Sequence, residues 1–220
     1  LIAYKTVDDM FDTDFGYRGN NQFLASFRDP NIADKSGSNG FESDNDGSGS
    51  NKTPLTAPKF SNVTIYGPYV FANLSGGNLS TNNASANYQN GSHLRRRTAI
   101  QIYNSAIVGW GRNNGVFFDK TDASAIFKGN YFGRTVGALK TLDNANGYSD
   151  ANFATDNAAI EATQSTVDLS TTFAGMIGAM NIATPNGLLT AASPLLTGAA
   201  TVPTGLTQTQ YIGAFDATTN

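Results

Sequence analysis

The chain contains no cysteine and little charge, and both shortages restrict what it can do. Without cysteine, its 220 residues can build neither a disulfide framework nor a thiolate metal site, and no cysteine nucleophile is available. His93 is the single histidine, which excludes histidine-based triads and multi-histidine zinc sites and favours a structural role. Charged residues make up 14% of the chain and its net charge is −3, so it carries no electrostatic footprint for nucleic acid or an anionic membrane.

Long apolar runs are also missing. The longest weakly polar stretch, residues 172–183, is rich in Gly and Ala and shorter than the roughly 20 apolar residues that cross a bilayer. We therefore predict no membrane-spanning segment. The first residues, 1–5, lack the basic and apolar regions of a signal peptide and have the pattern of a chain entered in mid-strand.

Asn, Thr, Ser and Gly supply most of the polarity, whereas Lys and Glu are scarce, and this composition favours extended structure with many turns over helix. Segments 60–67, 102–109 and 126–133 share one outline: an apolar residue, a spacer, Asn or Gly, then a short apolar strand closed by Gly. The Asn or Gly supplies the left-handed backbone that a tight bend needs. Stacked roughly 4.8 Å apart, such units let Asn side chains hydrogen-bond from coil to coil.

This repeat predicts an all-β fold, a right-handed parallel β-helix with long loop insertions and at most one or two short helices. We expect one domain over residues 1–220. The repeats begin about 42 and then about 24 residues apart, so insertions must leave the coils at their corners, and the polar segments 35–58 and 71–92 fit that role. Residues 150–163 are the one stretch predicted as helix. A β-sandwich is the alternative, but Asn-Gly hairpins between alternating runs are scarce.

Six motifs carry a resemblance: LIAYKTVDDMFDTDFGYRGNNQF, SFRDPNIADKSGSNGFESDND, PKFSNVTIYGP, HLRRRTAIQIYNSAIVGW, TAASPLLTGA and YIGAFDA. Together they resemble the C-terminal half of a family of secreted or outer-membrane proteins of the Bacteroidota, over nearly the whole chain. The resemblance implies a pectate-lyase-like β-helix, an extracellular or outer-membrane location, and no established enzymatic activity. It also implies further coils upstream of Leu1.

Acidic residues concentrate early in the chain, with nine of the seventeen between positions 8 and 46. In ESDNDG at 42–47 they alternate before a glycine, as in the first half of an EF-hand loop, and calcium takes six to eight oxygen ligands. The twelfth position is Thr53 rather than Glu, so the motif is incomplete. A calcium site would consist of Asp12, Asp14, Glu42, Asp44 and Asp46 if the two acidic segments meet. The alternative is a solvated acidic loop held by Asx turns.

The only basic cluster, HLRRR at 93–97, belongs to a predicted strand, in which successive side chains point to opposite faces. If its apolar members face the core, Arg96 points inward while His93, Arg95 and Arg97 point outward. A buried guanidinium must be paired. The parity of VDDMFDTDF turns Asp9 inward, so we expect a structural ion pair between Asp9, or failing it an acid from 42–46, and Arg96. The alternative is a strand break near Arg97 that turns all three arginines to solvent.

Aromatic residues could form a sugar-stacking platform, but in a solenoid they are expected to stack inside the core. The residues concerned are Tyr66, Tyr69, Phe71, Trp110, Phe117, Phe118, Tyr131 and Phe132.

Two function classes follow. The first is a non-catalytic extracellular or cell-surface β-helix that acts in surface binding, adhesion or assembly of an outer-membrane complex, with calcium as a stabilising ion. The second is a carbohydrate-active enzyme, either a polysaccharide lyase or a glycoside hydrolase with paired carboxylates. Outward Asp8, Arg95 and Arg97 are then ligand-binding candidates and polysaccharide a partner. In either class, the edge at 1–4 is expected to pair with upstream coils of the same polypeptide or with another chain.

Overall fold

The computed structural model describes residues 1–72, 84–110, 113–133, 138–143, 153, 156–157, 159–160 and 181–218. Two parallel sheets dominate it. The first, of eight strands, contains β1 (Ile2–Tyr4), β3 (Asn20–Phe27), β5 (Lys59–Tyr66), β7 (Gln101–Tyr103), β8 (Ala106–Val108), β10 (Ile126–Lys128), β11 (Tyr131–Gly133) and β13 (Ala159–Ile160). The second, of five strands, contains β2 (Phe11–Thr13), β4 (Phe41–Ser43), β6 (Asn90–Arg95), β9 (Asn114–Asp119) and β12 (Ala138–Asp143). Helical elements among the described residues include α1 (Pro68–Ala72) and the 3-10 turn η3 (Pro194–Leu196), and Phe153 and Asp156 are helical as well.

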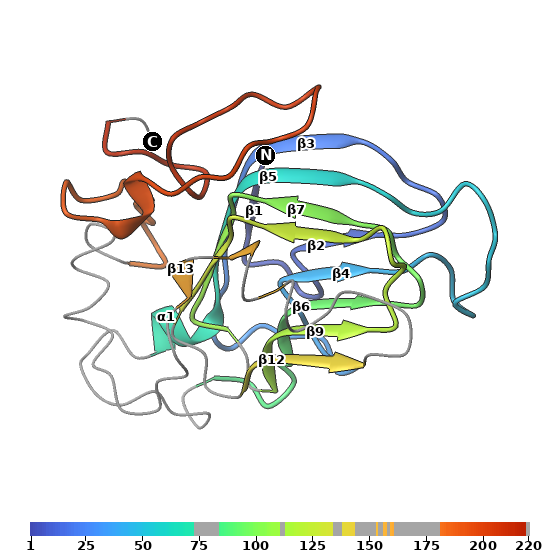
Figure 1. Ribbon diagram of the computed structural model, residues 1–220. Coiled ribbons are helices and arrows are strands. Elements are labelled where there is room, and N and C mark those ends of the chain that lie inside the picture. The colour runs from blue at the N-terminus through green and yellow to red at the C-terminus, as the bar shows by residue number, and fades with distance from the viewer. Residues whose placement is uncertain are drawn as a thin grey trace.

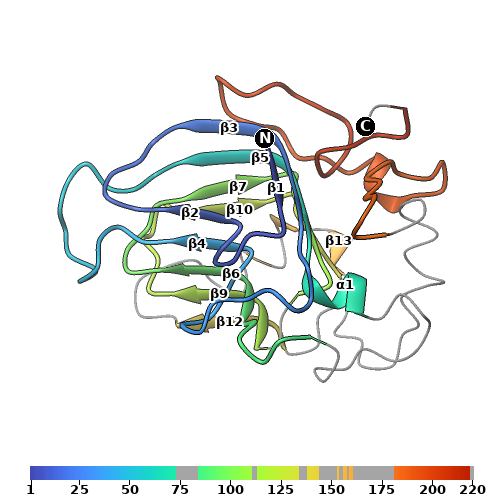
Figure 2. The ribbon, with the colours of Figure 1, turned by 180° about the vertical axis from the view of Figure 1, so that it is seen from behind.

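The chain winds from one sheet to the other and back, so that each coil lies on the preceding one (Figure 1 and, from behind, Figure 2). A coil consists of one strand of the second sheet followed by a bent strand, or a pair of strands, of the first sheet. Every strand pairing is parallel, as in β3 on β5 and β6 on β9. The predicted all-β, parallel β-helix is therefore confirmed.

The bend inside the first sheet is the repeat that the sequence predicted. Asn62, Asn104 and Gly129 all have left-handed backbone, with φ of 52°, 46° and 67°. The flanking strands stack in register, although it is Phe127, one residue after the expected Ile126, that lies against Ile102.

The same bend recurs in β3, which the sequence pattern did not reveal. The β3–β5 register aligns Phe23 with Asn62, and Phe23 has a φ of 59°. A search for Asn or Gly misses this coil, because an aromatic residue occupies the left-handed position at a conformational cost.

Inward side chains form one continuous core. Phe41 is completely buried, and its ring centroid lies 5.5 Å from that of Phe11 and 5.1 Å from that of Phe60. Tilted and edge-to-face ring contacts thus join the two sheets within a coil and one coil to the next. The core interpretation is confirmed for Trp110, Phe118 and Phe132, which are buried among the inward side chains. Four further candidates are buried in a second apolar cluster outside that core: Tyr66, Tyr69, Phe71 and Tyr131.

The predicted loop 35–58 is interrupted by β4. Phe41 is the only large apolar residue of that strand, and polar neighbours hide it from any test of periodicity. The second predicted insertion, 71–92, ends in β6, and its positions 73–83 lie outside the described residues, as does most of the expected helix 150–163. Within that stretch, Phe153 and Asp156 are helical, as expected, whereas Ala159 and Ile160 form the strand β13. Residues 172–180 of the weakly polar stretch are also outside the description, and the described helices include none long and apolar enough to cross a membrane.

The C-terminal segment, residues 181–218, belongs to no coil. It lies along the outside of the first sheet, where Leu189, Leu195, Ile212 and Phe215 bury the outward side chains of that sheet in a second apolar cluster (Figure 1).

The bend asparagines fasten this segment. Asn62 Nδ2 donates to Thr209 Oγ1 and to the carbonyls of Tyr211 and Gly213 at 2.9–3.1 Å. Asn104 binds both backbone groups of Ala200, at 2.8 and 2.7 Å. The coil-to-coil ladders that we expected at these positions occur elsewhere, with Asn114 donating to Asn90 and Asn90 to Asn39.

Replacing Asn62 should loosen the C-terminal segment. We expect Asn62→Ala to lower the free energy of unfolding by about 2–3 kcal/mol, because buried acceptors lose their donor and Ala is strained in left-handed backbone. Asn62→Gly should lose about 1 kcal/mol less, since Gly tolerates that backbone. Urea unfolding measures both, with exposed Asn31→Ala as the control expected within about 0.5 kcal/mol of wild type. Equal effects of all three substitutions would contradict this role.

Candidate functional site

Charged side chains form two rows across the outer face of the second sheet. The strand registers align Asp12 with Glu42, Glu42 with His93, and His93 with Phe117. The adjacent row aligns Arg95 with Asp119. Neighbouring strands in a sheet lie roughly 4.8 Å apart, so charges from four successive coils meet on one surface.

Arg95 joins the carboxylates of this surface. Its Nε donates to Asp44 Oδ1 at 2.9 Å, and its Nη2 contacts Glu42 Oε1. The three side chains are largely buried, with exposed fractions of 22% for Arg95, 16% for Glu42 and 11% for Asp44. Charge-assisted pairs of this geometry are stronger than exposed ones. Arg95 therefore points outward, as predicted, and is paired rather than free.

Two carboxyl groups here, those of Glu42 and Asp9, hold their protons unusually well. Burial raises the pKa of Glu42 to about 7, the charge of Asp9 adds to the rise, and Arg95 opposes it. Burial likewise raises the pKa of Asp9 to about 6, against a hydrogen bond from the Asn39 N–H. A carboxyl group with a pKa near 7 can give or take a proton at neutral pH.

His93 closes the row on the other side. Its ring stacks on Phe117 with centroids 5.1 Å apart, and Nε2 lies 3.4 Å from Asp119 Oδ2. Burial lowers the pKa of His93, the charge of Arg95 lowers it further, and Asp119 opposes both. Phe117 is the one aromatic candidate that is not buried in the core, and only the strand register shows that it lies beside His93.

The five expected calcium ligands do not converge. Glu42 and Asp44 are engaged by Arg95, and Asp46 accepts hydrogen bonds from the backbone and hydroxyl groups of Ser48 and Ser50. Asp12 and Asp14 line a separate pocket of about 350 Å³ at the N-terminal edge. Among the described residues, no three His, Cys, Asp or Glu side chains are arranged to hold a metal ion. Glu42 is on β4 and Asp44 and Asp46 follow it in the turn, where their oxygens already accept from Arg95, Ser48 and Ser50 instead of converging as in a calcium loop.

The expected ion pair between Asp9 and Arg96 is wrong. The β6 strand ends at Arg95, and Arg96 and Arg97 turn with φ of 49° and 66°, so strand parity stops before it can point Arg96 inward. Arg96 does meet the fallback partner, an acid from 42–46, because it lies 3.4 Å from Asp44, but it does so at the surface, with its side chain 41% exposed, and not inside the fold. Arg97 is 40% exposed and lies 3.4 Å from Asp122. The alternative of a strand break describes these two arginines correctly.

The buried arginine is instead Arg28, which the sequence analysis did not select. It is completely buried, donates to the carbonyls of Val7 and Asp8 and to Tyr88 Oη, and lies over the Tyr88 ring at 5.0 Å. A guanidinium with five donors can thus be satisfied by carbonyl groups and a phenol instead of a carboxylate. Arg28 thus holds the acidic segment through the backbone carbonyls of Val7 and Asp8, while the Asp8 side chain stays exposed.

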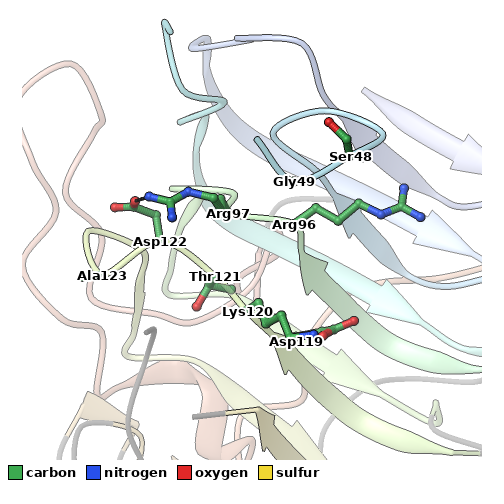
Figure 3. Close-up of a pocket in the computed structure, with 9 residues that line it drawn as sticks. All are labelled: Ser48, Gly49, Arg96, Arg97, Asp119, Lys120, Thr121, Asp122 and Ala123. Carbon is green, nitrogen blue, oxygen red and sulfur yellow. Dashed lines mark hydrogen bonds and ion pairs between the residues drawn. The ribbon is translucent and has the colours of Figure 1, made fainter. Parts of the chain in front are cut away.

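A pocket of about 680 Å³ opens beside the turn at Arg96 and Arg97. Its walls come from three successive coils: Ser48, Gly49, Arg96, Arg97, Asp119, Lys120, Thr121, Asp122 and Ala123. Figure 3 shows Arg97 extending toward Asp122 and Arg96 extending in the opposite direction, below the turn at Ser48 and Gly49. It is the one described pocket with two arginines and a lysine in its wall.

These features were compared with known proteins. The family model described as a pectate-lyase-like β-helix domain matches residues 1–181. The chain belongs to this family. No curated protein and no solved structure matches it. The described coils, from β1 to β13, lie within the matched range, and the C-terminal segment that packs against them lies almost entirely beyond it.

Of the three consecutive arginines at 95–97, Arg95 should contribute most to stability. We expect Arg95→Ala to lower the free energy of unfolding by about 1–3 kcal/mol, because it strands two half-buried carboxylates. Arg96→Ala and Arg97→Ala remove exposed pairs and should each cost about 0–1 kcal/mol. Chemical unfolding of the three variants provides the measurement, and equal losses would refute the assignment.

Glu42 should make stability depend on pH. Because its pKa is raised to about 7 in the folded domain, its contribution is complete below about pH 4.5 and is lost as pH rises through 7. The free energy of unfolding of the wild type should fall between about pH 5 and pH 8. We expect the fall to be about 1–2 kcal/mol smaller in Glu42→Gln.

Asp34→Asn is the matched control for this pH dependence. Hydrogen bonds from Ser36 lower the pKa of Asp34, so its contribution is constant above its unfolded pKa. The control should therefore follow wild type between the two pH values, and an identical slope in Glu42→Gln would contradict the prediction.

Proposed function

We propose that this domain is a non-catalytic binding and assembly module, displayed at the extracellular or outer-membrane surface, whose N-terminal edge receives a further parallel β-coil. The observation that carries the proposal is the distribution of exposed apolar side chains. Among the described residues, the large ones all lie within the first 23 positions: Leu1, Ile2, Tyr4, Val7, Phe15, Tyr17 and Phe23. A monomer rarely exposes so concentrated an apolar surface without a partner.

The backbone at this edge supports the same proposal. β1 lies at one end of the first sheet and β2 at one end of the second, and both are the N-terminal ends of their sheets. Each offers a row of backbone groups to another strand, which natural proteins cover or blunt to prevent uncontrolled pairing. The interface would continue the parallel stacking that already joins β1 to β3 and β2 to β4.

The occupant of the edge is a coil with apolar inward side chains, from upstream residues of the same polypeptide or from another chain. Such a coil would cover the pocket at Leu1, Phe11 and Phe60 and continue the cluster of ring contacts among Phe60, Phe41 and Phe11. The export, the adhesive role and the polysaccharide partners in this proposal rest on the resemblance of the sequence to secreted and outer-membrane proteins. Calcium is not part of it.

Charged substitutions at the edge test the assembly function. In sedimentation velocity over a range of concentrations, the chain should self-associate, and Ile2→Lys combined with Phe15→Lys should weaken association at least about tenfold, because lysines oppose edge pairing. The two side chains are 65% and 76% exposed, so the melting temperature should hold. Exposed Thr201→Lys, on the C-terminal segment, is the control. A chain that stays monomeric at every concentration and binds no apolar dye would overturn the proposal.

A carbohydrate-active enzyme is the second candidate, favoured by one observation. Glu42, with a pKa of about 7, aligns with Asp12 on the neighbouring strand of the outer face, as an acid and a carboxylate must do in a hydrolase. Arg95 and Asn39 already bind its oxygens, so this carboxyl group is tied into the sheet. Incubation with acidic and neutral polysaccharides tests this candidate. Cleavage that Glu42→Gln abolishes without unfolding the domain would show that the domain is an enzyme and would overturn the proposed binding role.

A further inference from the structure

The coils turn at a second corner, after the strands of the second sheet, and this corner differs from the first in its residues. Arg96, Arg97 and Lys120 have left-handed backbone there, with φ of 49°, 66° and 57°. The first corner uses mainly Asn and Gly for the same conformation. Long side chains are strained in this region, and strained residues gather at functional sites. At the second corner, cationic residues thus occupy positions where Gly or Asn would adopt the left-handed backbone at a lower cost.

The hydrogen bonds that form this corner use the backbone alone. Arg96 N–H donates to the Asp119 carbonyl at 3.2 Å and Arg97 N–H to the Lys120 carbonyl at 2.8 Å. Any residue except proline supplies these groups. The side-chain pairs of Arg96 and Arg97 are long, 3.4 Å each, and both guanidinium groups are about two-fifths exposed. Their charges are therefore only loosely neutralised within the domain.

The pocket at this corner gathers those charges. Three cations face two carboxylates in its wall, and Asp119 is also drawn to His93. Ser124 donates twice to Asp122 Oδ1, which leaves Oδ2 for Arg97, and the buried Arg97 Nε has no partner. The wall of the pocket thus carries one more cation than carboxylate, and Asp44, which lies outside the wall, pairs with Arg96.

We propose that this pocket binds an oxyanion, a sulfate, phosphate or carboxylate group, through Arg97, Lys120 and, after release from Asp44, Arg96. Guanidinium groups bind such anions by parallel hydrogen bonds, and Lys adds a point charge. The volume of about 680 Å³ exceeds a single anion and suits a saccharide-sized ligand. The site lies at the corner of the coils, apart from the N-terminal edge, so it does not depend on assembly.

Thermal unfolding in sodium sulfate and in sodium chloride of equal ionic strength tests the site. Sulfate stabilises all variants slightly through exclusion from the surface. Wild type should gain an additional rise in melting temperature that saturates with sulfate concentration. Arg97→Gly and Lys120→Gly should lose this saturable rise, while their melting temperatures in chloride stay equal to wild type or increase, since Gly relieves the left-handed backbone.

Lys5→Gly is the matched control, because Lys5 is also a left-handed lysine, with a φ of 51°, and lies outside the pocket. It should keep the full sulfate response. Titration with dextran sulfate and neutral dextran then identifies the source of the anion: binding at least about tenfold tighter to dextran sulfate than to free sulfate indicates a polyanionic chain, and equal binding indicates a small anion. No saturable response in wild type, or the same response in the pocket variants, would overturn the proposal.

Discussion

Every coil of this domain must bend at a fixed point and remain in register with the coil beneath it. Parallel strands stack with one residue opposite one residue, so a bend in one coil compels a bend at the same level in the next. Phe23, Asn62, Asn104 and Gly129 meet this constraint with left-handed backbone at equivalent positions. These bends form a column along the stack of coils. The column fixes which rings point inward, which charges point outward and where the C-terminal segment attaches.

The column of bends also fixes the positions of the polar side chains at the corners. At the first corner the amides of Asn62 and Asn104 point to the outside and hold the C-terminal segment against the sheet, so one residue type supplies both the bend and the clasp. At the second corner, Arg96, Arg97 and Lys120 leave their charges around a pocket. Between the corners, the second sheet spreads its carboxylates over several strands, where Arg95 neutralises them.

Strand parity predicted the charged face only as far as the strand continues. It gave the outward direction of Arg95 correctly, because that residue is the last of β6. It failed for Arg96, since a left-handed turn rotates the next side chains independently of the pleat. Arg28 was missed for a different reason: its partners are carbonyl groups of residues 7 and 8 and the Tyr88 hydroxyl, and no pattern of charged residues marks such a site.

The sequence by itself determined the class of fold and the level of the bends, because left-handed backbone favours Asn and Gly and because apolar residues repeat on either side of them. It also indicated that most of the aromatic residues would be buried. Only the tertiary structure decided which charges meet, since Glu42, Arg95 and Asp119 come from three different coils separated by insertions of unequal length. Such contacts depend on which coils are neighbours in the stack. The packing of the whole solenoid sets this order, and local sequence does not.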